Sequence, residues 1–138
     1  MIVIVKEKVR YYETDMMGIA HHSNHIRWFE CGRSEYLQRA GVDLNELMKR
    51  GIIYPIKHVS CEYLHPIYFG DILRIETTVK RLTRAQMVCT YRLVRDIDDT
   101  LLAIGETQNV FALQKTGVPT RLDLENYNKL KALQNADT

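Results

Sequence analysis

Hydrophobic and polar positions follow a strand-like pattern at the start of the chain and a helical period directly after it. The segment 2–12 is rich in β-branched and aromatic residues, which is typical of a strand. Across Asn24–Ala40, apolar residues recur at three- and four-residue steps, as on an amphipathic helix. Ser23 or Asn24 is expected to cap the start of this helix and Gly41 to end it. A shorter helix is expected over 44–50.

The expected long helix has a charged surface and an apolar stripe that contains a glycine. Charged residues, among them Glu30 and Arg33, occupy much of the surface outside the stripe. Gly32 lies within the stripe, where it costs roughly 1 kcal/mol of helix propensity relative to alanine. Close packing can offset that cost, so we expect the helix backbone to press against something flat at Gly32.

The second half of the chain is strand-like almost throughout. Apolar and polar residues alternate along 72–82 and 86–95, so one face of each strand is expected to be buried. The last strand is apolar on both faces, as is typical of the interior of a sheet. Short turns join these strands and force antiparallel neighbours, which predicts an α+β domain whose antiparallel sheet wraps one helix. The expected elements are strands over 53–64, 72–82, 86–95 and 101–113 and a final helix over 122–133.

Composition narrows the class of protein. The 138 residues are 46% hydrophobic and 26% charged, which predicts a single globular domain over 1–138. A net charge of +2 without a basic block gives no sign of a nucleic-acid partner. Cys31, Cys61 and Cys89 are odd in number and form no CxxC motif, which favours a reducing compartment. The apolar run at the N-terminus is too short for a signal peptide or a membrane span, so we expect a cytoplasmic protein.

The densest group of reactive side chains lies at 13–25, between the first strand and the start of the long helix. Three interpretations are open. Asp15 and Ser23 can simply cap turns and helices, with the histidines at the surface. Asp15, His21 and His25 can bind a metal ion. Alternatively, Asp15 can act as nucleophile or general base in acyl transfer, beside unpaired helix amides that hold a developing oxyanion.

Two motifs carry a resemblance to a known family. The run VRYYETDMMGIAHHSNHIRWFE at 9–30 and the run EYLHPIYFGDILRI at 62–75 resemble the signatures of hotdog-fold acyl-CoA thioesterases. The similarity is to the 4-hydroxybenzoyl-CoA thioesterase-like branch, which includes the Tol-Pal-associated group. The resemblance implies a hotdog fold, with a five- to six-stranded antiparallel sheet wrapped around one long central helix. It also implies a pocket between subunits of a homodimer or homotetramer, and no cofactor.

The resemblance also implies roles for individual residues. Asp15 matches the catalytic carboxylate, and His22 matches the position whose backbone amide polarises the thioester carbonyl. Relatives often carry Tyr or Phe at the position of His21 and usually Tyr at that of His25, so the acyl pocket is expected to differ in shape. Independently of the resemblance, Ser60 or Glu62 on the following strand is a back-up candidate for orienting a water or the carbonyl; the alternative is that both simply belong to an exposed strand face. The expected substrate contacts are Gly18, His21, His25 and Ser60. From their positions near strand ends, Lys57, His58, Arg81 and Arg84 are candidates for the phosphates of CoA; the alternative is that they are solvated, as basic residues in turns mostly are.

The resemblance therefore predicts hydrolysis of acyl-CoA to free acid and CoA. A thiolate leaves readily, so no strong general acid is required, and the chain holds no GxSxG motif. Two other functions remain open. One is a hotdog domain that binds acyl-CoA or fatty acid without turnover. The other is a dehydratase of hydroxyacyl thioesters, which works through a paired histidine and carboxylate on different segments.

Overall fold

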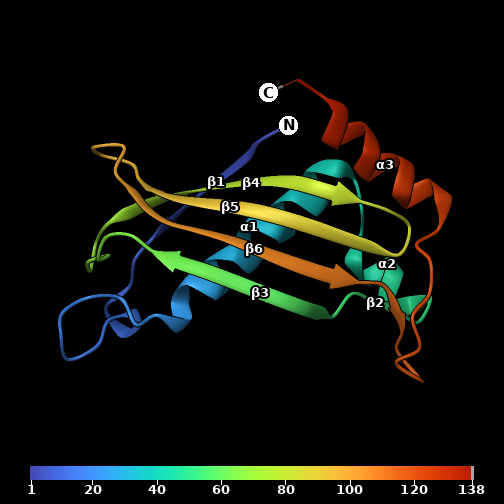
Figure 1. Cartoon of the computed structure of the whole chain (residues 1–138), viewed down its shortest axis with the longest axis horizontal. Helices are drawn as coiled ribbons and strands as arrows, with labels where there is room; N and C mark the ends of the chain where they lie inside the picture. Colours follow the sequence, from blue (N-terminus) through green and yellow to red (C-terminus); the bar gives the residue numbers. More distant parts are fainter. Residues whose placement is uncertain (138) are drawn as a thin grey trace.

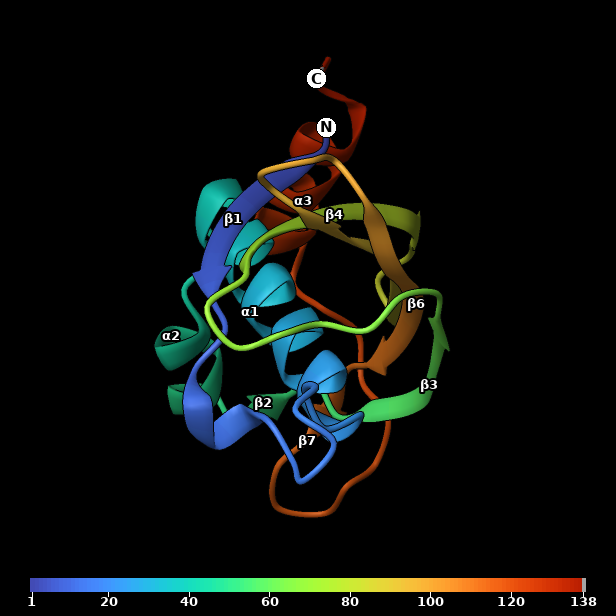
Figure 2. The same ribbon diagram turned by 90° about the vertical axis from the view of Figure 1, so that its left-hand side faces the viewer.

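A curved antiparallel sheet of five strands wraps around one long helix, as the computed structural model of the chain shows (Figures 1 and 2). The structure describes residues 1–137. The order of the strands in the sheet is β1-β4-β5-β6-β3, and every neighbouring pair is antiparallel. The elements of this layer are α1 (Ser23–Ala40), β1 (Val3–Lys8), β3 (Ile56–Tyr63), β4 (Ile72–Leu82), β5 (Gln86–Arg95) and β6 (Leu101–Val110). The α+β class and the hotdog architecture expected from the sequence are confirmed.

Smaller elements close the two ends of this layer. The short strands β2 (Ile52–Ile53) and β7 (Ala112–Leu113) pair with each other beside α2 (Leu44–Lys49). The 3-10 turn η1 (Tyr11–Glu13) precedes α1, and α3 (Leu124–Asn135) packs against α1 and β4. No helix within residues 1–137 is both long and apolar enough to cross a membrane.

The observed strand boundaries agree with the predicted ones where the alternation of apolar and polar residues is regular, and they differ where the chain bends. β4 and β5 span the predicted residues. The predicted strand 53–64 is divided at Pro55, which has no N–H to continue a ladder and whose carbonyl instead accepts the Val110 N–H at 3.1 Å. The predicted strand 101–113 is divided after β6. The first strand ends at Lys8 rather than Tyr12, because the Glu13 carboxylate accepts the Arg10 N–H at 2.7 Å and turns the chain.

The inner face of the sheet contacts α1 closely at two glycines. A Cβ atom on Gly32 would overlap the Thr77 hydroxyl and lie 2.8 Å from Ile75 Cγ2, so the helix backbone rests on β4 as predicted. On β6, a Cβ atom on Gly105 would overlap the ring of Phe29. That ring stacks on Tyr91 with a centroid distance of 4.5 Å. The two glycines therefore set how deeply α1 lies in the curved sheet.

Candidate active site

Asp15 begins a tight turn in the loop between η1 and α1. Its N–H donates to the Ile19 carbonyl at 2.9 Å, and its carbonyl accepts the Gly18 N–H at 3.0 Å. One carboxylate oxygen, Oδ1, accepts the Met17 N–H at 2.8 Å. Gly18 has a φ of 80°, which glycine adopts without strain, so its role in the structure is to close this turn. Within residues 1–137, the other oxygen, Oδ2, makes no hydrogen bond and is available to a ligand.

The loop is fixed to the rest of the protein on both sides. The Ala20 N–H donates to the Ile67 carbonyl at 2.7 Å, which ties the loop to the segment that follows β3. The side-chain amide of Asn24 donates to the carbonyls of Glu13 and His21 at 2.7 and 3.2 Å. The His21 N–H also donates to Glu13, at 2.8 Å. These bonds hold the turn at a fixed distance from the start of α1.

The N-terminus of α1 leaves a backbone donor unpaired. The helix begins at Ser23, and neither Ser23 nor Asn24 caps it, in contrast to the prediction from the sequence. His21 instead accepts the first two backbone N–H groups of the helix. Its Nδ1 accepts the Ser23 N–H at 3.2 Å, and its carbonyl accepts the Asn24 N–H at 3.0 Å. In the described part of the chain, no hydrogen bond involves the His22 N–H. This group lies at the positive end of the helix dipole, where it can donate to an oxyanion.

Aromatic rings enclose the start of the helix. The Tyr63 hydroxyl donates to the His22 carbonyl at 3.1 Å. The ring of His25 lies edge-on to Tyr63 with centroids 4.6 Å apart, and His22 lies 6.5 Å from the same ring. His25 is buried, and burial lowers its pKa to about 4. His25 is therefore uncharged at neutral pH.

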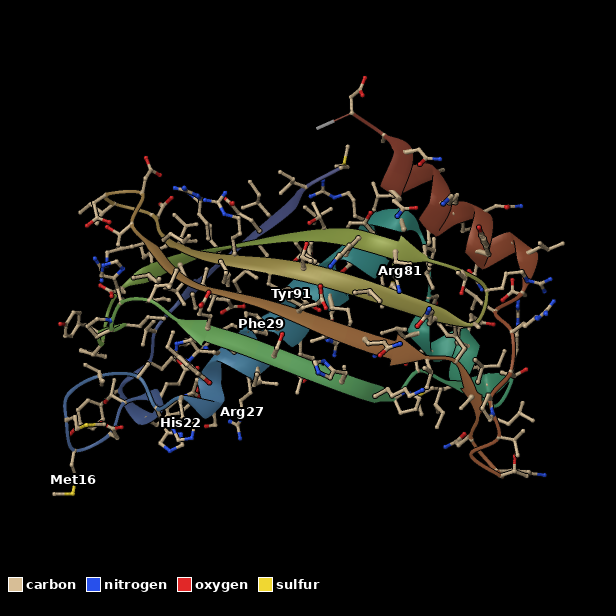
Figure 3. All side chains as sticks on the ribbon, viewed as in Figure 1. Met16, His22, Arg27, Phe29, Arg81 and Tyr91 are labelled. Carbon is tan, nitrogen blue, oxygen red and sulfur yellow. The ribbon has the colours of Figure 1, made fainter. Side chains whose placement is uncertain are left out.

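One cavity of about 330 Å³ brings these features together. It lies between the Asp15 loop, the start of α1 and the end of β3, and Figure 3 shows His22 at this end of the helix. Its walls are largely apolar, and Asp15 is the one acidic residue among those that line it. The lining residues are Asp15, Met17, Ile19, Ala20, His22, His25, Tyr63, Leu64, His65, Pro66 and Ile67. A carboxylate and an unpaired helix amide beside an apolar cavity suit an acyl group whose carbonyl becomes negatively charged.

Other expected substrate contacts do not line this cavity in a single chain. His21 is exposed, and its Nδ1 lies 2.8 Å from Ser23 Oγ. His58 and Arg81 line a small pocket of about 120 Å³, and Lys57 is exposed next to His58 on β3. Figure 3 shows Arg81 far from His22. Arg84 Nε donates to the Leu122 carbonyl at 2.8 Å, which fastens the segment before α3.

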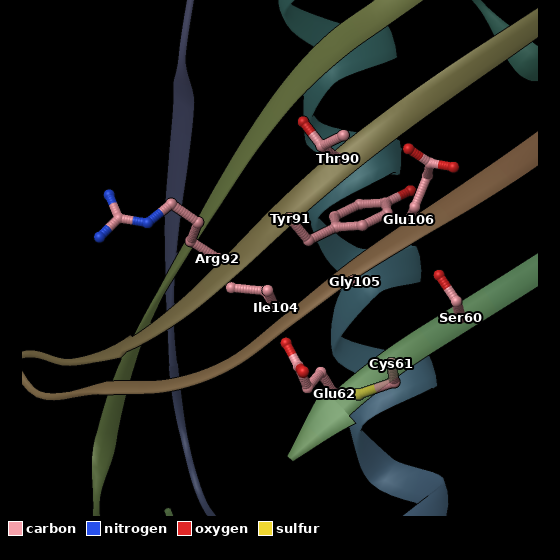
Figure 4. A pocket seen from close by; sticks show the side chains of 9 residues that line it. All are labelled: Ser60, Cys61, Glu62, Thr90, Tyr91, Arg92, Ile104, Gly105 and Glu106. Atoms are coloured by element: carbon pink, nitrogen blue, oxygen red, sulfur yellow. The ribbon is translucent and has the colours of Figure 1, made fainter. Parts of the chain in front are cut away.

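Ser60 and Glu62 belong to a groove on the outer face of the sheet, opposite α1 (Figure 4). The groove measures about 550 Å³ and crosses β3, β5 and β6. Two of the charged side chains that line it are paired within the sheet: Glu106 with Lys80 and Arg92 with Glu76, each at 3.0 Å. It contains no helix N-terminus, so one chain does not bring Ser60 or Glu62 to Asp15.

Two observations go against the metal interpretation of the 13–25 segment. No group of three or more His, Cys, Asp and Glu side chains within residues 1–137 is arranged to hold a metal ion. His21 Nδ1 contacts Ser23, and His25 is buried against Tyr63.

The sequence gives no indication of the role of Tyr63. The second motif contains this residue, but its contact with the start of α1 depends on the pairing of distant strands.

Comparisons with known proteins identify the family of the chain. Residues 9–133 match the model of the thioesterase-like superfamily. The 1,4-dihydroxy-2-naphthoyl-CoA hydrolase of Thermosynechococcus vestitus is 31% identical over 103 residues, covering 74% of this chain and 70% of that protein. The acyl-CoA thioester hydrolase YbgC of Escherichia coli O6:H1 is 27% identical over 99 residues, covering 72% and 73%. The crystal structure of the DHNA-CoA thioesterase of Staphylococcus aureus superposes with a TM-score of 0.89 at 30% identity, covering 97% and 93%.

Proposed function

Because the chain belongs to the thioesterase-like superfamily, we propose that it hydrolyses the thioester bond of acyl-CoA, releasing the free acid and CoA. Relatives named as acyl-CoA thioester hydrolases support this activity. The observation that carries the proposal is that Asp15 and His22, whose backbone N–H is unpaired, both line one largely apolar cavity. The two groups supply what acyl transfer requires: an attacking or proton-accepting oxygen and a donor for the oxyanion.

In this mechanism the thioester carbonyl lies over the start of α1. The His22 N–H donates to the carbonyl oxygen, and this bond strengthens as negative charge develops in the tetrahedral intermediate. The helix dipole acts in the same direction. Loss of one such donor commonly reduces the rate by about 10²- to 10³-fold. The neutral His25 beside it adds no charge to the pocket at pH 7.

Asp15 acts by one of two routes. In the first, Oδ2 attacks the carbonyl carbon, the C–S bond breaks, and CoA leaves as a thiolate that takes a proton from solvent. Water then opens the mixed anhydride to release the acid and regenerate the carboxylate. In the second, Asp15 accepts a proton from a water that attacks the carbonyl carbon directly. Rapid-quench mass analysis in a single turnover distinguishes them, because only the first route adds the acyl mass to a peptide containing Asp15.

The active unit that we propose is a homodimer, or a homotetramer made of two such dimers. β3 is an edge strand, and every residue of it except Cys61 is exposed. An exposed edge offers unpaired backbone groups to a second copy. Antiparallel pairing of two β3 edges about a two-fold axis places the start of one strand beside the end of the other. The partner's Lys57 and the partner's His58 then lie near Tyr63, at the cavity, where they can meet CoA phosphates.

A panel of acyl-CoAs incubated with the purified protein tests the proposal. Release of free thiol, followed with a thiol-trapping dye, is the expected result. Tight binding of intact thioester without thiol release would instead identify a binding protein, and an enoyl product would identify a dehydratase. Comparison of aromatic and aliphatic acyl-CoAs in the same assay identifies the acyl class, including whether the chain shares the substrate of the 4-hydroxybenzoyl-CoA thioesterase-like branch.

A further inference from the structure

A second cavity lies between α1, α2, β2 and the start of β3. Its volume is about 410 Å³, and no lining residue is shared with the Asp15 cavity. Most of its wall is aliphatic or aromatic, and three polar residues interrupt it: Glu30, Arg33 and Asn109. The remaining lining residues are Leu44, Leu47, Met48, Ile52, Ile53, Tyr54, Pro55 and Ile56. Arg33 follows His25 by eight residues of helix, or about 12 Å along the axis, so the two cavities are separate sites in one chain.

Arg33 is a buried cation without an acidic partner. The sequence places it on the charged surface of the helix, but only 6% of the residue is exposed, because α2 and the β2 segment fold over it. Its Nη1 donates to the Tyr91 hydroxyl at 3.3 Å, and its Nε has no hydrogen bond. No carboxylate in the described part of the chain lies within 4.0 Å of the guanidinium. By contrast, Arg74 and Arg95 each pair with acidic side chains.

The surroundings of Arg33 fix its position without neutralising it. The Tyr91 hydroxyl that accepts its bond lies 2.6 Å from Thr107 Oγ1, and burial raises the pKa of Tyr91, which keeps this phenol neutral. Glu30 lines the cavity but is exposed and forms no ion pair with Arg33. The ring of Tyr54 lies 6.0 Å from the guanidinium carbon. A buried charge in such surroundings is costly unless a counter-ion joins it.

A second buried polar group points to the same conclusion. Asn109 is 1% exposed; its Nδ2 donates to the Tyr54 carbonyl at 2.6 Å, whereas its Oδ1 has no partner. Buried polar atoms in folded proteins are rarely left unpaired. The cavity thus combines an apolar wall with a fixed guanidinium that lacks a counter-ion.

We propose that this second cavity binds a carboxylic acid with an apolar body, whose carboxylate pairs with the Arg33 guanidinium. The planar fork of arginine matches a carboxylate, and the aliphatic wall takes the hydrocarbon part of the ligand. A free acid and an acyl group with a terminal carboxylate share this chemistry. An ordinary acyl-CoA thioester does not, because its carboxyl group is bonded to sulfur.

Calorimetric titration of the purified protein with sodium octanoate tests the proposal, with octanamide as the uncharged probe of the same length. We expect saturable binding of about one octanoate per chain and at least tenfold weaker binding of octanamide. Arg33→Met should weaken octanoate binding at least tenfold, whereas Arg27→Met, which removes an exposed arginine from the same helix, should leave it unchanged. Met48→Trp, which fills the cavity and keeps Arg33, should weaken octanoate and octanamide alike.

Several outcomes would overturn the proposal. These are no saturable binding at millimolar octanoate, equal affinity for the two probes, and equal affinity of wild type and a folded Arg33→Met variant. If Arg33→Met does not fold, unchanged binding by Met48→Trp overturns it. Displacement of octanoate by octanoyl-CoA in an Asp15→Asn variant would place the acid in the Asp15 cavity instead. The titration requires no turnover, so absence of thioesterase activity would count against the proposed function but not against this site.

Discussion

The Tyr63 hydroxyl donates a hydrogen bond of 3.1 Å to the carbonyl oxygen of His22, across 41 residues of sequence. This bond joins the end of β3 to the start of α1, and it lies on the wall of the cavity that contains Asp15. The position of the unpaired His22 N–H therefore depends on a strand that comes long after it in the chain. The position of this candidate oxyanion donor therefore depends on how the strands of the sheet pair.

Replacing Asp15 by asparagine should reduce acyl-CoA hydrolysis by about 10²- to 10⁴-fold and leave the fold intact. The Asn amide oxygen can still accept the Met17 N–H that Asp15 Oδ1 accepts, so the turn persists. Thiol release and circular dichroism measure the two effects. Asp43→Asn is the matched control: this residue caps α2 by accepting the Asn45 N–H, which asparagine also does well. Undiminished turnover of every acyl-CoA by the Asp15 variant would remove Asp15 from the chemistry.

Tyr63→Phe tests whether the bond to His22 positions the helix start. We expect kcat to fall several-fold with little change in KM, because the donor is displaced while the apolar wall remains. The loss of one exposed hydrogen bond should lower the free energy of unfolding by no more than about 0.5–1.5 kcal/mol. Steady-state kinetics and urea unfolding provide both values. Tyr68→Phe, on an exposed tyrosine outside the cavity lining, should change neither kcat nor stability. Equal effects of the two substitutions would contradict a positioning role.

The buried His25 should make stability depend on pH. Its folded-state pKa of about 4 lies below the ordinary 6.5, so between these values the unfolded chain binds more protons than the folded one. Stability is therefore full above pH 6.5 and falls as the pH is lowered toward 4, by on the order of 3 kcal/mol from this group. Urea unfolding at pH 7, 5.5 and 4.5 measures the slope. His25→Phe should flatten it, whereas His58→Gln, on an exposed histidine, should not. An unchanged slope in His25→Phe would contradict this assignment.

Gly32→Ala should destabilise the protein although alanine favours helices. The added methyl would overlap Thr77 and approach Ile75, and overpacking of this kind costs about 1–3 kcal/mol, against roughly 1 kcal/mol gained in helix propensity. We expect a lower melting temperature, and partial recovery on combining the change with Thr77→Ala. The control Ser34→Ala, at an exposed position on the same helix, should be neutral or stabilising. A more stable Gly32→Ala protein would mean that α1 does not rest on β4 at this point.

Charge on the β3 edge should separate the proposed dimer. Val59 is 41% exposed on β3, and Val59→Lys introduces a buried charge if two such edges pair. The expected result is a monomer by light scattering, with loss of thioesterase activity because each cavity loses the partner's contribution. Ile4→Lys places the same charge at a comparably exposed position on β1, the opposite edge, and should keep the dimer. A monomeric and fully active wild-type protein would contradict the shared site.

The sequence by itself determined the elements whose signals lie within a few residues of each other. The period of apolar residues predicted α1 and its end at Gly41, which has a φ of 86°, and strict alternation predicted β4 and β5. Gly32 in the apolar stripe predicted that the backbone of α1 contacts a flat surface at this position. The resemblance of the two motifs pointed to the fold and to Asp15 and His22, which the folded chain places on one cavity.

Tertiary structure alone decided the relationships between distant segments. β3 pairs with β6 rather than with β4, its neighbour in the chain, and in this arrangement the Tyr63 hydroxyl reaches the His22 carbonyl. The helical period assigns Arg33 to the charged surface of α1. In the folded chain, however, α2 and β2 bury this residue beside a cavity. Helical period and strand alternation reflect interactions over a few residues, whereas burial and hydrogen bonding across the sheet depend on which remote segments the folded chain places in contact.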